Sequence, residues 1–211
     1  MELYLGSLPS ATQPSIWVKD DNRIRKGTLE NHFRVVMETP KTSIAHLYSA
    51  DQDYNLNNEV YLDAIQSILS MTYVQTLRED EGGTYGASVQ KISSKQPEEY
   101  GAMLIAFDTD PERQERMLQV VKADVLNLAK NGPSEEYVNK TRENLLKNRQ
   151  ENVIKNNFWQ QSLISYYTED LDVVTDYEQI VKGITPGNVK KFIKKFLKQK
   201  NFIDISMNPE Q

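Results

Sequence analysis

The most apolar stretch of the chain lies in its first half. Residues 64–77 carry no charge, and Val60, Tyr61 and Leu62 shortly precede them. Apolar side chains therefore occupy most sides of a helix here, as expected of a helix packed on two faces. The uncharged run of 14 residues contains Gln, Ser and Thr, and it is too short for a membrane span. It predicts a buried core helix.

Five segments alternate between apolar and polar positions, which is typical of strands that face a core. They centre on Phe33 to Met37, Ile44 to Tyr48, Tyr85 to Val89, Met103 to Phe107 and Phe202 to Met207. The polar residues 93–99 predict that the third and fourth segments are antiparallel neighbours. Residues 10–31 are polar and predict a loop.

Helix start and stop signals dominate the second half. Asp110-Pro111 and Ser134 predict two helix starts, the second helix reaching about Lys155, while Thr175-x-x-Glu178 is a capping box and Thr185-Pro186 opens a last helix. Four aromatic residues follow at helical spacing, namely Phe158, Trp159, Tyr166 and Tyr167. We expect them to pack into the core rather than to contact a peptide. The lysines of the last helix favour a solvated face over a nucleic-acid or membrane patch.

These patterns predict an α+β fold. No internal repeat, low-complexity tract or linker interrupts residues 1–211, so we expect one domain. The strands are antiparallel neighbours and most helices follow them, which predicts one largely antiparallel sheet with helices packed on one face.

Composition excludes several classes of site. The net charge is −5 and 26% of residues are charged, so a nucleic-acid partner is not indicated. There is no cysteine, and the two histidines, His32 and His46, lie in predicted strands without an H-x-x-E-H motif. We expect both to be structural and the chain to hold no catalytic metal. No membrane span and no targeting segment is visible, so periplasmic and cytoplasmic locations both remain open.

A charged, glycine-rich turn links the apolar helix to the third strand. Arg78 is followed by three acids, then by Gly82-Gly83 and Tyr85. The glycines permit φ > 0, so the chain can turn sharply and bring Tyr85 back beside the helix end. The acids diverge on such a turn, and we expect them to be solvated rather than to bind metal. On physical grounds alone, Arg78 could equally cap the helix dipole and Tyr85 could be an ordinary strand aromatic.

The sequence LREDEGGTYGASV resembles the Arg/Tyr segment in the second half of the pitrilysin/insulinase family of zinc metallopeptidases, the inverzincins. Arg78 and Tyr85 stand seven residues apart, with a glycine-rich turn between them, on an apolar helix. The resemblance implies a C-terminal, non-zinc-binding domain with the processing-peptidase-like fold. Tyr4-Leu5-Gly6-Ser7-Leu8-Pro9 resembles the end of that domain's first helix. We therefore expect the first strand and most of the first helix to be missing from this chain.

The resemblance also implies roles for individual residues. Tyr85 would be catalytic, as a donor to the transition state, while Arg78, Gly82 and Gly83 would bind substrate. Zinc would be held by another domain of the same polypeptide, peptide would be the substrate, and the chain alone would be inactive. The glycines could instead serve only the turn. Two alternatives remain: a non-catalytic homologue of the cytochrome bc core-subunit type, and a peptide-binding module.

Overall fold

The structure is a computed structural model, and it describes residues 23–84 and 86–210. The predicted helix end at Tyr4–Pro9 lies outside the described residues, and so does Tyr85.

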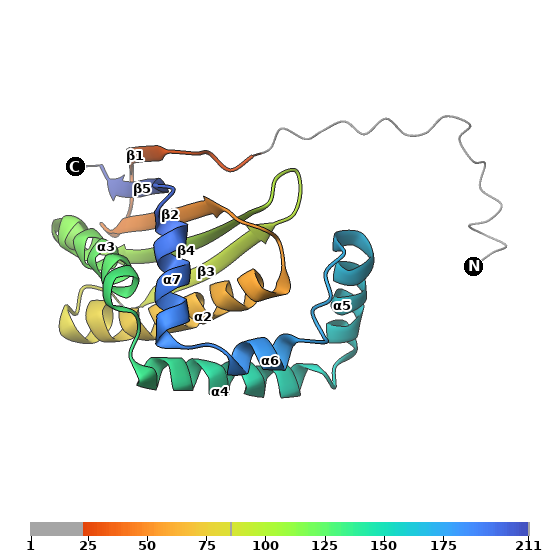
Figure 1. Cartoon of the computed structure of the whole chain (residues 1–211). Coiled ribbons are helices and arrows are strands. Elements are labelled where there is room, and N and C mark those ends of the chain that lie inside the picture. The colour runs from red at the N-terminus through yellow and green to blue at the C-terminus, as the bar shows by residue number, and fades with distance from the viewer. Residues whose placement is uncertain (1–22, 85, 211) are drawn as a thin grey trace, which may run out of the picture.

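The described residues build one five-stranded sheet with the order β1-β5-β2-β4-β3 (Figure 1). Its strands are β1 (Thr28–Val35), β2 (Thr42–Asp51), β3 (Ala87–Ser94), β4 (Tyr100–Thr109) and β5 (Asn201–Pro209). β1 runs parallel to β5, and the other neighbours are antiparallel. The sheet is thus largely antiparallel, as predicted.

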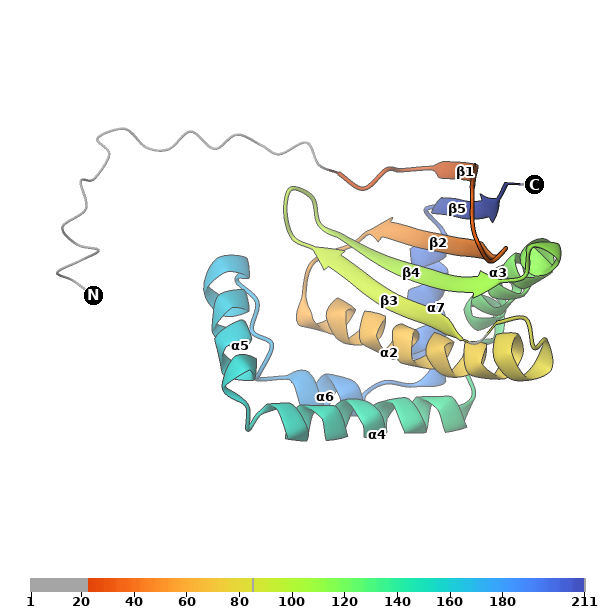
Figure 2. The same ribbon diagram turned by 180° about the vertical axis from the view of Figure 1, so that it is seen from behind.

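The helices lie on one side of this sheet (Figures 1 and 2). They are α2 (Leu56–Tyr73) with its π-helical extension η1 (Val74–Asp80), the 3₁₀ turn η2 (Pro111–Arg113), α3 (Gln114–Asn131), α4 (Glu135–Asn152), α5 (Asn156–Glu169), α6 (Tyr177–Lys182) and α7 (Pro186–Leu197). α2, α3 and α7 contact the strands, and α4 and α6 cover the far side of α2. The predicted α+β class is confirmed.

α2 is the centre of the core. Its buried residues include Leu62, Ile65, Ile68 and Leu69, each 1% exposed, and they face the sheet and the helices α4, α6 and α7. Packing on two faces explains why this helix is apolar on most sides. The side chain of Asn55 caps its start by accepting a hydrogen bond from the N–H of Asn58 at 2.9 Å.

The second and fourth strands bury one face and leave the other partly exposed. Ile44, Ile105 and Phe107 are buried on the helix side, as the alternation predicts. Their neighbours Leu47 and Leu104 are partly exposed on the opposite side, which we call the open face of the sheet.

The first strand differs from its prediction. β1 already begins at Thr28, within the predicted loop, and it ends before Met37. Phe33 and Val35 are 42% and 38% exposed, so they do not face the helix-covered core. Phe33 pairs with Met207 and lies with it on the open face, because the helices do not extend over that side.

Two helix predictions are wrong. Trp159, Tyr166 and Tyr167 of α5 are 47%, 55% and 79% exposed, so the aromatic stripe is not part of the core. The capping box fails because Asp176 takes the N-cap position of α6 without a side-chain bond, while the Thr175 hydroxyl bonds to Asp172. Ser134 and Thr185, in contrast, cap α4 and α7 through their side chains.

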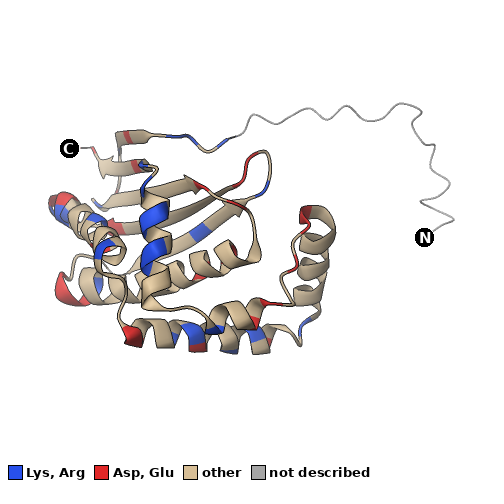
Figure 3. Ribbon diagram, viewed as in Figure 1, with Lys and Arg blue, Asp and Glu red and all other residues tan. Residues whose placement is uncertain are grey.

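The lysine-rich last helix is amphipathic. Val189, Ile193 and Phe196 are buried against the body of the domain, and the basic residues form the outer band of α7 in Figure 3. Of the six lysines in this region, Lys190 is half-buried and the others are exposed. The lysines therefore form a solvated face, as predicted.

Candidate functional site

The predicted Arg/Tyr segment begins where α2 widens into a π-helical turn. The N–H of Glu81 donates to Thr76 O and the N–H of Gly83 to Leu77 O, both at 3.1 Å. π-Helical turns are rare and occur frequently at functional sites. Leu77 is fully buried, whereas Arg78 in the same turn is exposed. The end of the helix is therefore packed into the core through Leu77, while the Arg78 guanidinium is exposed to solvent.

The π-helical turn is also tied to α3. The Thr76 hydroxyl donates to Asp124 Oδ2 at 2.8 Å, and the carbonyl oxygen of Thr72, 3.1 Å away, is an alternative acceptor. Burial raises the pKa of Asp124, although the Thr76 hydroxyl opposes this shift. Asp124 therefore lies in a partly desolvated contact between the two helices.

The two glycines of the turn have different surroundings. Gly82 is exposed and has φ +58°, the left-handed conformation that favours glycine. Gly83 is buried against α3: an added Cβ would lie 2.2 Å from Met117 Sδ. The predicted sharp turn is therefore present, and Gly83 additionally packs closely against the Met117 side chain. Substrate binding by either glycine stays a prediction.

Residues far away in the sequence hold the turn in place. The buried Thr109 hydroxyl donates to the carbonyl of Gly83 at 2.7 Å. Arg113 Nη1 donates to the carbonyl of Glu81 at 2.8 Å, and Arg116 Nε to its carboxylate at 3.0 Å. Of the three acids, Glu79 and Asp80 are exposed, while Glu81 is half-buried and pairs with the exposed Arg116. The sequence shows no local signal for these contacts, which join residues 26 to 35 positions apart.

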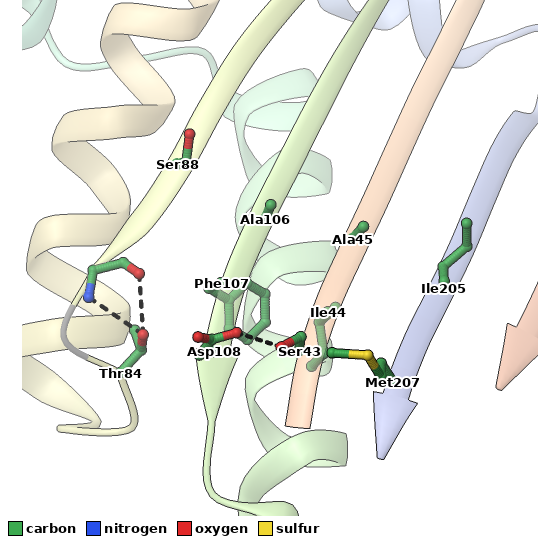
Figure 4. A pocket seen from close by; sticks show the side chains of 11 residues that line it. Ser43, Ile44, Ala45, Thr84, Ser88, Ala106, Phe107, Asp108, Ile205 and Met207 are labelled. Carbon is green, nitrogen blue, oxygen red and sulfur yellow. Dashed lines mark hydrogen bonds between the residues drawn. The ribbon is translucent and has the colours of Figure 1, made fainter. Parts of the chain in front are cut away.

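The turn ends at a concavity of about 580 Å³ on the open face. Figure 4 shows its lining across four strands: Ser88, Ala106, Ala45 and Ile205 point toward the viewer, and Thr84 lies at one end. The Thr84 hydroxyl donates to the carbonyl of Gly86 at 3.0 Å and accepts its N–H at 3.3 Å. Tyr85, between these two lining residues in sequence, lies outside the described residues.

One carboxylate borders this concavity. Asp108 accepts hydrogen bonds from Lys41 Nζ and from the Ser43 hydroxyl, both at 2.6 Å. These bonds, with Lys41 contributing most, lower the pKa of Asp108 below its usual value. The carboxylate is therefore ionised and already paired, which makes it a weak candidate for a general base.

No group of three or more His, Cys, Asp or Glu side chains that could hold a metal ion occurs between residues 23 and 84 or between 86 and 210. His32 Nδ1 lies 2.7 Å from the Ser206 hydroxyl. His46 is fully buried, with its Nδ1 3.5 Å from Asp204 Oδ2, and Lys122 Nζ contacts the same oxygen at 2.8 Å. Within the described ranges, neither histidine thus belongs to a group of three side chains of the kind that holds zinc.

Comparison with known proteins identifies the family. The family model described as the peptidase M16 inactive domain matches residues 1–145. The chain belongs to the M16 peptidase family and corresponds to its inactive domain. The Escherichia coli protein named probable zinc protease PqqL is 26% identical over 204 residues, which cover 92% of this chain and 21% of that protein. The chain thus spans about a fifth of the length of this curated relative.

Solved structures of M16 proteins share the fold. The periplasmic protease PqqL from Escherichia coli matches with a TM-score of 0.80 and 22% identity, over 98% of this chain and 23% of that chain. A peptidase M16 inactive domain from Pseudomonas fluorescens matches with a TM-score of 0.72 and 19% identity, over 88% of this chain and 44% of that one. Within the described part of the chain, no helix is both long enough and apolar enough to span a bilayer.

Proposed function

We propose that this chain is the substrate-binding, transition-state-stabilising half of a zinc-dependent endopeptidase. The metal site would lie in another domain, and peptides would be cleaved in a chamber between the two halves. One observation carries the proposal: an exposed arginine and the residues flanking Tyr85 belong to a single turn that ends at an open concavity and is fixed to α3 and β4.

The chemistry assigned to this chain needs no metal of its own. Peptide hydrolysis passes through a tetrahedral oxyanion, and a neutral phenol such as Tyr85 is a suitable hydrogen-bond donor to it. The Arg78 guanidinium offers a forked, permanently charged grip on a substrate carbonyl. Gly82, which is exposed, would let substrate backbone approach the turn, while the buried Gly83 would support it from beneath. Zinc, when bound to the other domain, supplies the activated water.

The open face of the sheet is the surface we assign to the partner zinc-binding domain. In β5, the helix-facing residues Asp204 and Ser206 are polar and buried, whereas their apolar neighbours on the open face are only partly covered, namely Ile203, Ile205 and Met207. A sheet face that is more apolar than the covered side of the same strand indicates a missing layer. PqqL from Escherichia coli is four to five times as long as this chain, judged from the 21–23% of it that the match covers, and it is long enough to include such a layer.

Arg78 provides the first test. In the complete protein, Arg78→Met should raise KM for a peptide substrate, because a charged hydrogen-bonding group is lost, while the zinc content stays unchanged. Arg78→Lys should restore the charge but not the forked geometry, and should recover only part of the loss. The control is Lys147→Met, which removes an exposed charge from α4. Kinetics unchanged by Arg78→Met would contradict the assignment.

A further inference from the structure

In α5, most of the large apolar side chains face solvent rather than the body of the domain. The residues turned toward the body are spaced at i, i+4, i+7 and i+11: Phe158, Ser162, Ser165 and Glu169 are buried or half-buried. Two of these four are serines. The outward side instead carries large apolar residues that are 44% to 79% exposed, namely Trp159, Leu163, Ile164, Tyr166 and Tyr167. We call these five residues the outward stripe.

The helix is attached at its ends rather than along its length. At its start, the Arg149 guanidinium lies over the Phe158 ring, 4.4 Å from the centroid, and Trp159 Nε1 donates to the carbonyl of Val153 at 2.7 Å. At its end, Glu169 accepts a hydrogen bond from the Tyr54 hydroxyl at 2.8 Å and another, through its carbonyl, from Lys95. α5 is therefore held in place, and its exposed stripe is not the result of a detached helix.

The outward stripe has the character of a permanent contact. Residues 156–168 contain no charged side chain, and Figure 3 shows no charged residue along most of α5. Exposed Ile154, in the link before the helix, extends the apolar surface. Permanent interfaces are more apolar than transient ones and are depleted in charge, and Trp and Tyr contribute disproportionately to their affinity. A stripe of this composition left in water would also be an aggregation hazard.

We propose that α5 is a docking helix whose outward stripe is covered by another domain of the same, longer polypeptide. Such a partner is favoured over a separate protein because α5 lies within the part of the chain that matches relatives of which it makes up only 21–23%. The surface is distinct from the site proposed above. Figures 1 and 2 place α5 beside the start of α2, whereas the Arg78 turn lies at the other end of that helix. The inference therefore does not rest on the roles of Arg78 and Tyr85.

Photo-crosslinking in the complete protein tests this contact. A benzophenone amino acid is placed singly at position 163 or 167 of the outward stripe, or, as the control, at position 147, an exposed site of α4. After irradiation, mass spectrometry should find α5 joined to residues of the same polypeptide outside this domain, with several-fold higher yield than from position 147.

The other outcomes overturn the proposal. Cross-links between a heavy-isotope-labelled and an unlabelled copy would indicate a homodimer contact instead. Cross-links confined to this domain, or a yield no higher than at position 147, would show that the stripe is not covered by another domain. None of these positions belongs to the Arg78 turn. The cross-links therefore test the contact made by α5, and peptidase activity separately tests the function proposed for Arg78 and Tyr85.

Discussion

Gly83 packs against the side chain of Met117. A Cβ at this position would lie 2.2 Å from Met117 Sδ and 2.8 Å from Met117 Cε, so the fully buried Met117 side chain would have to shift. Gly83→Ala should therefore lower the free energy of unfolding by about 1–3 kcal/mol through overpacking. Met117→Ala alone should cost about 2–5 kcal/mol, because Met117 is fully buried.

A double-mutant cycle separates steric conflict from other causes. If the clash is the cause, the double variant should be less destabilised than the sum of the two single variants, by roughly 0.5–3 kcal/mol in urea unfolding. Gly86→Ala is the control, because an added Cβ there meets nothing within 4 Å. Strict additivity of Gly83→Ala and Met117→Ala would refute the packing explanation.

Asp204 makes stability depend on pH. Burial raises the pKa of its carboxyl, but the interactions with His46 and Lys122 outweigh burial and bring the pKa below its usual value of 3.8. The folded state then binds a proton less readily than the unfolded chain. Asp204 thus stabilises the fold above pH 4, and this contribution is lost as the pH falls through the lowered pKa.

The variant Asp204→Asn should weaken the pH dependence of the free energy of unfolding in acid. Measured by urea unfolding between pH 2 and 6, its free energy of unfolding should fall less steeply below pH 4 than that of the parent protein. At pH 6 the variant should be less stable, because Lys122 and His46 lose their buried partner. Parallel curves for the two proteins would contradict the assignment.

Among the secondary-structure elements, local signals were only partly sufficient. The predicted caps at Ser134 and Thr185 are local hydrogen bonds, and both are present, whereas the capping box predicted at Thr175 does not form. Alternation identified β2 and β4 because their partners lie within this chain. For β1 and α5, hydrophobicity predicted burial, but no element among the described residues covers Phe33, Val35 or the outward stripe. A hydropathy pattern shows that a side chain is apolar, but it does not show which surface covers that side chain.

Arg149 joins three elements and provides a test of how α5 is held. Its guanidinium lies 4.4 Å from the ring centroid of Phe158 and 4.6 Å from that of Tyr177. It also donates to the carbonyls of Val173 and Val174, at 3.0 and 3.4 Å. Arg149 thereby connects the end of α4 to the start of α5 and to the segment before α6.

Arg149→Ala should loosen this junction. We expect faster amide hydrogen exchange in α5 and in residues 170–176, while α2 and β4 keep their protection. Lys147→Ala, on the same helix but with only a 4.0 Å contact to Glu151, should leave exchange unchanged. Unaltered exchange in α5 after Arg149→Ala would mean that other contacts hold it.

For the whole molecule, the candidate site could be predicted only in part. The spacing of Arg78, the glycines and Tyr85 is readable in sequence, and so is the turn between helix and strand. The contacts that fix the turn come from Thr109, Arg113 and Arg116, and only the tertiary fold brings these residues to it. The concavity likewise requires four strands in a specific order, which pairs β2 with β5 across most of the chain.

The central claim is that a phenol on this domain stabilises the transition state of a reaction whose metal lies elsewhere. The most direct measurement is the turnover number of the complete protein carrying Tyr85→Phe, with zinc content measured in parallel and Tyr137→Phe, on α4, as the control. We expect a loss in kcat on the order of 10²–10³, with KM and zinc content nearly unchanged. A kcat equal to that of the Tyr137→Phe control would contradict it.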